Sequence, residues 1–186
     1  MTPAEFIDRW TKSGGAETAN SQTFLNELCD LLELPHPDPT EADESHNNYV
    51  FEKSVLFNNG DGTTSQGRID LYRAGAFVLE SKQGAEAKAA ILEEALATKT
   101  KKKKIRAGTA TRNTPAWEQA MVKARNQAKR YAEAIPDEWP PFLIVLDVGH
   151  CFDLYADFTQ SGKNYVPFRH PNEFTSNIRS SVRICC

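Results

Sequence analysis

Hydrophobic positions in the first 34 residues recur every three to four residues, which is the period of an amphipathic helix. The pattern predicts helices over residues 3–12 and 17–34, and Thr2 followed by Pro3 is a typical start for the first of them. Residues 35–48 read PHPDPTEADESHNN, and their prolines and polar side chains predict a loop.

From residue 48 the hydrophobic period changes to two, which is typical of strands. We expect NYVFEKSVLF, QGRIDLYR and AFVLESK to form three antiparallel strands joined by the turns NNGDG and AG. Helices are expected over 85–99 and 115–135, with a basic loop over 99–115 between them. The apolar run PPFLIVLDVG at 140–149 is typical of a strand buried on both faces, and CFDLYADF is expected to pair with it as a hairpin.

This order of elements, α-α-β-β-β-α-α-β-β, predicts an α/β fold with a mixed sheet flanked by helices. We assign it to one domain over residues 1–160, with loops at 35–48 and 99–115. The tail over 161–186 is weakly patterned, and its final SSVRICC has the character of a truncation or a fragment end.

The composition excludes several classes of protein. The chain has 186 residues, of which 40% are hydrophobic and 25% are charged, the balance of a soluble globular domain. It has no apolar run near the about 20 residues that a membrane helix needs, and the pattern of its first residues, MTPAEFIDRW, does not predict a signal peptide. We therefore expect a cytoplasmic protein with no membrane partner. The cysteines lack zinc-ligand spacing, which favours reduced thiols; they are Cys29, Cys151, Cys185 and Cys186.

The formal net charge of -3 hides a strong asymmetry along the chain. Residues 1–60 carry eleven acids against three bases, whereas residues 99–130 carry eleven bases and one acid. Such a basic segment can hold the phosphates of DNA without reading its sequence. A solvated loop is the alternative for the lysine run alone. The candidate DNA-binding residues are Lys101, Lys102, Lys103, Lys104, Arg106, Lys123 and Arg130.

Two carboxylates and an ammonium are expected to meet at the ends of neighbouring strands. Asp70 ends one strand, and Glu80 and Lys82 end the next after a tight turn. Alternation along the strand places Glu80 and Lys82 on one face, beside Asp70, while Ser81 points away. An ordinary cross-strand ion pair is the alternative to a functional site.

A divalent cation would relieve the repulsion between paired carboxylates. Mg²⁺, or Mn²⁺ in its place, accepts few protein carboxylates and takes waters and phosphate oxygens as further ligands. We expect Asp70, Glu80 and the Ser81 backbone carbonyl to bind the metal, which would stabilise charge on a scissile phosphate. Lys82 would hold or activate the attacking water and neutralise charge in the transition state.

Three more residues are candidates for the same site. Gln127 and Tyr131 are four residues apart and so share one face of the long helix, where they would present an amide and a phenol to a phosphate or a catalytic side chain. A core tyrosine beside an exposed glutamine is the alternative. Glu17 is either an additional metal carboxylate or an acid that suits the start of a helix.

These residues resemble a known superfamily. Asp70, E-S-K at 80–82 and Q-A-K-R-Y at 127–131, within this order of elements, resemble the PD-(D/E)XK nucleases, and the Q-x3-Y helix is similar to that of their RecB-like branch. More narrowly, ETANSQTFLNELCDLLELP, GRIDLYRAGAFVLESKQG and QAKRYAEAIPDEWPPFLIVLDVGHCFDLYADF resemble the N-terminal nuclease region of MmeI-like (Type IIG/IIL) restriction–modification enzymes. The resemblance implies a restriction-endonuclease-like fold in which Asp70, Glu80 and Lys82 are catalytic and Gln127 and Tyr131 support them.

In MmeI-like enzymes the nuclease domain precedes an adenine-N6 DNA methyltransferase and a target-recognition domain. This chain has neither the glycine-rich S-adenosylmethionine loop nor the N-P-P-Y/F motif of the methyltransferase. The resemblance therefore implies an N-terminal fragment, with those domains as partners and S-adenosylmethionine acting only through a missing domain.

Three functions remain open at this point. The first is a Mg²⁺-dependent endonuclease domain that hydrolyses phosphodiester bonds in double-stranded DNA. The second is a non-cleaving nuclease-fold module that binds DNA for a defence methyltransferase. The third is a structural partner protein whose acid pair is accidental.

Overall fold

The computed structural model describes residues 1–13, 17–85, 110–136, 139–161, 164–168 and 183–185, with the backbone alone for 17–19 and 183–185. The helices are α1 (Pro3–Thr11), α2 (Glu17–Leu31), the short 3-10 helix η1 (Glu44–His46) and α4 (Pro115–Ala134). The strands are β1 (Tyr49–Asn58), β2 (Thr64–Arg73), β3 (Phe77–Lys82), β4 (Phe142–Asp147), β5 (Cys151–Ala156), β6 (Val166–Pro167) and β7 (Arg183–Cys185).

The strands form one mixed sheet in the order β1-β2-β3-β4-β5-β6, and β7 also pairs with β5. Among the described strands, β3 and β4 pair in parallel and every other pair is antiparallel. Parallel neighbouring strands need a long crossover connection, and here the connection between β3 and β4 contains helix α4. The predicted α/β fold with a mixed sheet flanked by helices is confirmed, and it is consistent with a PD-(D/E)XK-like fold.

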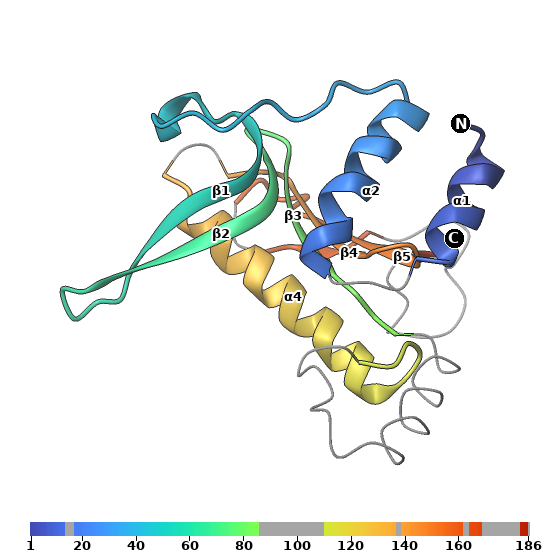
Figure 1. The fold of residues 1–186 in the computed structure, drawn as a ribbon. Helices are drawn as coiled ribbons and strands as arrows, with labels where there is room; N and C mark the ends of the chain where they lie inside the picture. The colour runs from blue at the N-terminus through green and yellow to red at the C-terminus, as the bar shows by residue number, and fades with distance from the viewer. Residues whose placement is uncertain (14–16, 86–109, 137–138, 162–163, 169–182, 186) are drawn as a thin grey trace, which may run out of the picture.

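Helices cover both faces of the sheet (Figure 1). On the face that we call the α2 face, α1 and α2 pack on the sheet through Phe6, Trp10, Phe24, Leu25, Leu71, Leu79, Leu146 and Val148. On the opposite face, the α4 face, α4 packs on the sheet through Val55, Ile69, Tyr72, Val78, Ala128, Tyr131, Ala132 and Leu143. Because helices cover both faces, successive residues of β3 and β4 are buried on alternate sides, which explains the continuous apolar sequence of these strands.

Helix α1 has a capping box at its start. The Thr2 hydroxyl accepts a hydrogen bond from the amide of Glu5, and the Glu5 carboxylate accepts one from the amide of Thr2. The other end of α1 meets the turn after β4, where Gly149 has a φ of 71°. A Cβ at Gly149 would lie 2.5 Å from the carbonyl oxygen of Trp10, so this contact requires glycine.

Residues 53–69 of β1 and β2 form a two-stranded ribbon that extends beyond the rest of the sheet (Figure 1). Its ladder runs from Lys53 opposite Ile69 to Asn58 opposite Thr64, whereas β3 pairs with β2 only over residues 71–73. The ribbon therefore leaves the three-stranded part of the sheet at Asp70, which is where the candidate site begins.

Several elements differ from the sequence predictions. Helix α2 ends at Leu31 rather than at residue 34, and Glu33 just beyond it has a φ of 55°. The short strands β6 and β7 lie in the segment expected as a weakly patterned tail, and both pair with β5. Most of the predicted 85–99 helix and of the 99–115 loop lies outside the described residues. In the part of the chain that the structure describes, no helix is both long and apolar enough to cross a membrane.

Candidate active site

Asp70 binds the backbone of β3 through its side chain. The ladder between β2 and β3 ends at Leu71 opposite Leu79. One step further, Oδ2 of Asp70 accepts a hydrogen bond from the Ser81 amide and another from the Ser81 hydroxyl, each 2.6 Å long. The Asp70 carboxylate thus occupies the position where the next rung of the ladder would be.

The position of Ser81 corrects one expectation. Regular alternation predicts that Ser81 points away from the carboxylates, but its hydroxyl donates to Asp70. The N–H and C=O of one strand residue point toward the same neighbour, so the Ser81 carbonyl also faces the β2 side. The backbone oxygen expected as a metal ligand is therefore directed toward the strand that carries Asp70.

Glu80 and Lys82 form an ion pair on the α4 face. Nζ of Lys82 lies 3.0 Å from Oε1 of Glu80, and alternation places both residues on the side of Val78. The Glu80 side chain is 2% exposed and that of Lys82 is 25% exposed. An ammonium that balances a buried carboxylate while reaching solvent can also meet an anionic substrate.

A break in the strand geometry lies opposite Asp70. Glu52 has a φ of 55°, although it is in the middle of β1. The register pairs Phe51 with Leu71 and Lys53 with Ile69, which leaves Glu52 opposite Asp70. A positive φ is uncommon for a residue other than glycine, so Glu52 marks an irregularity beside the candidate site.

The pKa of the Glu52 carboxyl depends on burial and on the charges of its neighbours. Burial raises its pKa above the ordinary value, the negative charge of Asp70 raises it further, and Arg68 acts in the opposite direction. Glu52 is not among the site residues expected from the sequence. The signal that would have found it is the register, because a short turn over 59–63 fixes which β1 residue faces Asp70.

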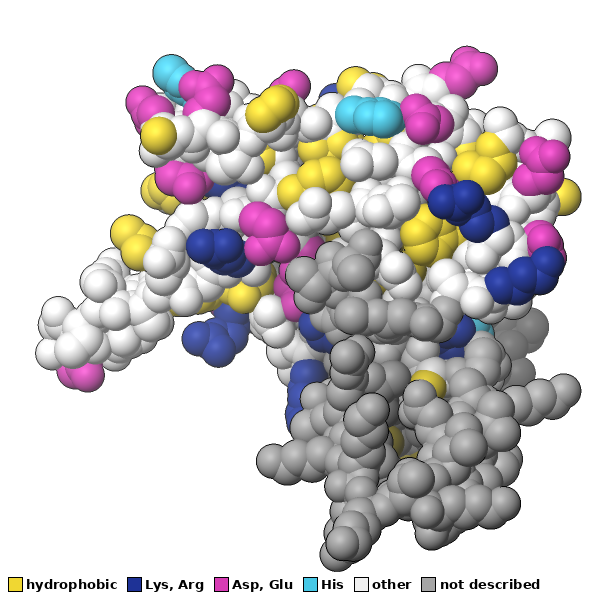
Figure 2. All heavy atoms as spheres, viewed as in Figure 1, with side chains coloured by type: hydrophobic (Ala, Val, Ile, Leu, Met, Phe, Trp, Pro, Cys, Tyr) yellow, Lys and Arg dark blue, Asp and Glu magenta, His cyan; other side chains and the backbone are white. Residues whose placement is uncertain are grey.

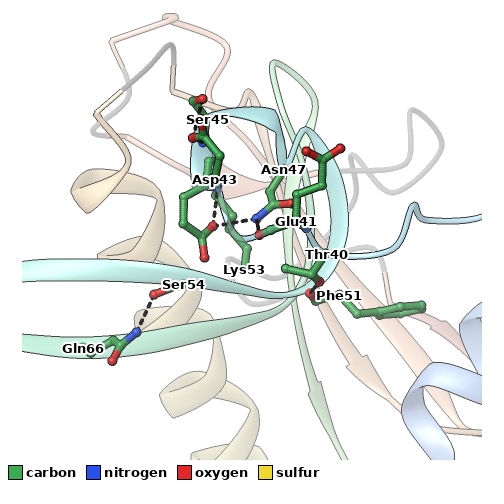
Figure 3. A network of polar contacts seen from close by, with 10 residues as sticks. Thr40, Glu41, Asp43, Ser45, Asn47, Phe51, Lys53, Ser54 and Gln66 are labelled. Atoms are coloured by element: carbon green, nitrogen blue, oxygen red, sulfur yellow. Dashed lines mark hydrogen bonds and ion pairs between the residues drawn. The ribbon is translucent and has the colours of Figure 1, made fainter.

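The loop before β1 holds the strand on both sides of Glu52 (Figure 3). The Thr40 hydroxyl donates to the Phe51 carbonyl at 3.3 Å, and Lys53 binds both the carboxylate and the backbone carbonyl of Glu44. Asn47, which is 1% exposed, bonds to the amide and the carbonyl of Glu41 and so fixes the loop itself.

The same loop has a second anchor close to η1. Asp43 accepts hydrogen bonds from the amide and the hydroxyl of Ser45 (Figure 3), and these bonds lower the pKa of Asp43. Along the ribbon, Gln66 donates to the hydroxyl of Ser54 at 2.6 Å.

Gln127 and Tyr131 are brought together on α4. The Gln127 amide donates to the Tyr131 hydroxyl at 3.0 Å. The Tyr131 ring stacks on Phe57 with centroids 5.7 Å apart, and Gly67 leaves room for it, since a Cβ there would be 2.5 Å from the ring. The pair thus joins α4 to the ribbon, and the tyrosine is largely a packed side chain whose hydroxyl is held by Gln127.

The remaining candidates fall into two groups. Lys123 and Arg130 are exposed on α4, and the guanidinium of Arg130 lies over the ring of Phe57 at 5.1 Å. Lys101 to Lys104 and Arg106 lie outside the described residues. Glu17 is the first residue of α2, and its side chain is likewise outside the described part. On the face shown in Figure 2, acidic and basic side chains lie close together where the ribbon leaves the body.

A buried polar cluster behind Lys82 was missed by sequence reasoning. Asp147 pairs in register with Lys82, and the Val148 amide donates to the Lys82 carbonyl at 2.9 Å. Asp147 is fully buried and binds the Arg112 guanidinium through two hydrogen bonds of 3.0 Å. It also accepts from the Gly84 amide and the Trp117 indole, at 2.9 Å and 2.8 Å.

This cluster connects the end of β3 to the start of α4. Ala85 forms a bridge with Thr111, and the Thr114 hydroxyl caps α4 by accepting from the Trp117 amide. Arg112 belongs to the basic segment, but its guanidinium is buried in an ion pair with Asp147 and is therefore not available to bind phosphate. The cluster instead fixes the backbone from which Lys82 projects.

The donor set is oxygen-rich but small. Among the described residues, no group of three or more His, Cys, Asp or Glu side chains is arranged to hold a metal ion. The two carboxylates of Asp70 and Glu80, with the carbonyl of Ser81 directly after Glu80, are a set that suits Mg²⁺, which retains several waters.

The mixed sheet with helices on both faces (Figure 1) is an α/β fold consistent with the restriction-endonuclease type. Asp70 lies within β2, which continues to Arg73, and not at a strand end as expected, whereas Glu80 and Lys82 are at the end of β3. Comparison with protein families agrees with this class. The family model described as "MmeI, N-terminal domain" matches residues 1–180, and the chain belongs to this family. It is therefore a restriction-enzyme-related domain of the nuclease class. No curated protein and no solved structure matches the chain significantly.

Proposed function

We propose that this domain is a Mg²⁺-dependent DNA endonuclease that hydrolyses phosphodiester bonds, with Asp70, Glu80 and Lys82 as its catalytic residues. The observation that carries the proposal is the contact of Asp70 with Ser81, which brings the first acid to the strand that holds Glu80 and Lys82. The family to which the chain belongs supports the same chemistry.

The residues fit a magnesium ion by their chemistry. Asp70 and Glu80 supply hard anionic oxygens and Ser81 supplies a neutral one, while Glu17 is a further candidate. When bound, the metal would stabilise the additional negative charge of the scissile phosphate. The Asp70 carboxylate is held by Ser81 and the Glu80 carboxylate by Lys82, so both acids are fixed on neighbouring strands.

Lys82 has a distinct part in the proposed reaction. Lys82 is two residues after Glu80 and so shares its face of β3. Its ammonium pairs with the Glu80 carboxylate and is partly exposed. It would orient the attacking water and neutralise charge on the phosphate. The Asp147 cluster holds the carbonyl end of the same residue, which limits the movement of its backbone.

Substrate contacts are assigned to the basic side chains. Lys123 and Arg130 on α4 would hold the phosphates of double-stranded DNA, together with Lys101 to Lys104 and Arg106. Gln127 and Tyr131 would support the site. Sequence specificity would come from methyltransferase and target-recognition domains of a longer protein, in the arrangement of MmeI-like enzymes.

The test is DNA cleavage in the presence of Mg²⁺ or Mn²⁺, by this chain alone and joined to its partner domains. Asp70→Ala, Glu80→Ala and Lys82→Ala should each abolish cleavage and leave the fold intact by circular dichroism. Asp8→Ala is the matched control, because it removes an exposed carboxylate from α1. Equal cleavage by the three site variants and the wild type would make the assignment wrong. Salt-sensitive DNA binding without any cleavage by the wild type would instead establish the non-cleaving module.

A further inference from the structure

Glu52 is the one described strand residue, other than glycine, that has a positive φ. The other three non-glycine residues with this conformation are Glu33, Asn113 and Gln160, and they lie after α2, before α4 and in a turn. Turns and helix ends accept the left-handed conformation readily, whereas the interior of a strand does so only when its surroundings impose it.

The two strands change their facing at this position. On β1, Phe51 packs on the α2 face while Val55 packs on the α4 face, although four residues of regular strand would keep them on one side. On β2, Leu71 packs on the α2 face and Ile69 on the α4 face, although they are only two residues apart. The reversal therefore occurs at Glu52 on one strand and at Asp70 on the other.

The reversal accounts for the direction of the Asp70 side chain. In a regular strand Asp70 would point to the α4 face like Tyr72. At the reversal it points instead along the sheet toward β3, where its carboxylate binds the amide and hydroxyl of Ser81. Without the reversal, the β2–β3 ladder would continue and this amide would be taken by the backbone.

The neighbours of Glu52 hold the irregular conformation in place. Thr40 binds the carbonyl of Phe51 on one side, and Glu44 binds the ammonium of Lys53 on the other. Lys53 is 13% exposed, and its ammonium also lies over the ring of Tyr72 at 5.8 Å. The conformation is thus supported by contacts before and after it, as expected for strain retained at a functional position.

We infer that the positive-φ kink at Glu52 is a positioning element of the active site. It directs the Asp70 carboxylate onto Ser81 and holds it where it would bind the metal ion. The consequence of the kink for catalysis rests on the proposed function, but its effect on the direction of the Asp70 side chain does not. The effect belongs to the backbone of Glu52 and not to its carboxylate. Glu52 is accordingly a positioning residue that acts through Asp70.

Two substitutions separate the backbone from the carboxylate. Glu52→Gly and Glu52→Val both remove the acid, but glycine accepts a positive φ and a β-branched side chain resists it. Leu56→Val is the matched control, because it places the same β-branched residue at an exposed position of β1 that has no positive φ. If Glu52→Val does not fold, Glu52→Leu replaces it in the comparison.

The first readout is the amide proton of Ser81 by NMR in the metal-free protein, with Asp70→Asn as the reference for a weakened bond. The second is Mn²⁺ affinity by titration, and the third is DNA cleavage. We expect Glu52→Gly and Leu56→Val to keep the wild-type Ser81 signal. Glu52→Val should shift that signal to the Asp70→Asn position and weaken Mn²⁺ binding on the order of tenfold.

The outcomes are distinct. An unchanged Ser81 signal in the folded Glu52→Val variant overturns the inference, and so does an equal loss in Glu52→Gly, which would assign the effect to the carboxylate. A shift of the Ser81 amide signal in Glu52→Val alone supports the inference, whether or not the wild type cleaves DNA. Absence of cleavage in a wild type with an intact signal would count against the proposed nuclease function only.

Discussion

Arg112 and Asp147 form a bidentate ion pair in the interior of the domain, directly behind the strand end that carries Lys82. Two hydrogen bonds of 3.0 Å join the guanidinium to the carboxylate, and a third of 2.8 Å joins it to the Val148 carbonyl. The pair thereby joins three segments: the end of β3, the turn that follows β4 and the residues that precede α4.

Removal of the cation alone should be strongly destabilising. Arg112→Leu leaves the fully buried Asp147 carboxylate with Gly84 and Trp117 as its donors among the described residues, so we expect a loss of about 3 to 5 kcal/mol in the free energy of unfolding. Urea denaturation measures it. Adding Asp147→Asn removes the uncompensated charge and should recover part of the loss. Lys12→Leu, which breaks the exposed pair with Asp8, should change stability by less than about 1 kcal/mol. A double variant no more stable than Arg112→Leu would contradict the argument.

The contact of α1 with the turn after β4 gives a second stability prediction. In Gly149→Ala the new Cβ meets the Trp10 carbonyl oxygen at 2.5 Å and the residue also has a positive φ. Gly75 is the control, since its φ is 63° and nothing lies within 4 Å of a Cβ there. We expect a loss of about 1 kcal/mol for Gly75→Ala, and about 1 to 3 kcal/mol more for Gly149→Ala from the clash. Thermal denaturation of both variants checks this, and equal midpoints would show that the turn adjusts freely.

The main elements were predictable because each has a local cause. The helical period with Thr2 and Pro3 predicts α1, and the alternating runs around two short turns predict the β1–β2–β3 meander. The apolar run at 140–149 predicts a strand covered on two faces, and β4 is that strand. Strands β6 and β7 have two and three residues, which is too short for any period to be visible.

The strands that carry the candidate residues were predictable, but the contacts of those residues were not. The pattern correctly assigns Asp70 to one strand and Glu80 and Lys82 to the end of the next, but Asp70 lies within β2 and not at its end. Its contact with Ser81 accompanies a kink at Glu52 that no local residue type predicts. Arg112 lies in a basic segment and its partner is 35 residues away, so composition suggests a surface charge where the fold has a buried one. Both features arise from tertiary contacts, which a period or a motif does not contain.

The pKa of Glu52 predicts a pH-dependent effect on stability. Its pKa is raised above 4.5 by burial and by Asp70, so the folded state binds this proton more tightly than the unfolded state. The resulting stabilisation is present below the unfolded pKa and is lost as the pH rises through the folded value. We therefore expect Glu52→Gln to be more stable than the wild type near neutral pH, with the difference vanishing below 4.5. Melting temperatures across this range measure it; a constant difference at every pH would mean that packing, and not ionisation, distinguishes the two.

The exposed cations of α4 should contribute to DNA affinity without contributing to specificity. Arg130 is exposed and its guanidinium lies over Phe57, near the far end of the ribbon's ladder, and Lys123 is exposed two turns earlier. Each would neutralise one phosphate, so Arg130→Ala and Lys123→Ala should each weaken duplex binding equally for all sequences and lower the salt dependence by about one unit of slope. Fluorescence anisotropy at several salt concentrations provides the slopes. Lys12→Ala, at the residue just after α1, is the control, because α1 covers the opposite face of the sheet from α4. If all three variants lose affinity equally, the binding is a diffuse charge effect and α4 is not the phosphate-contacting surface.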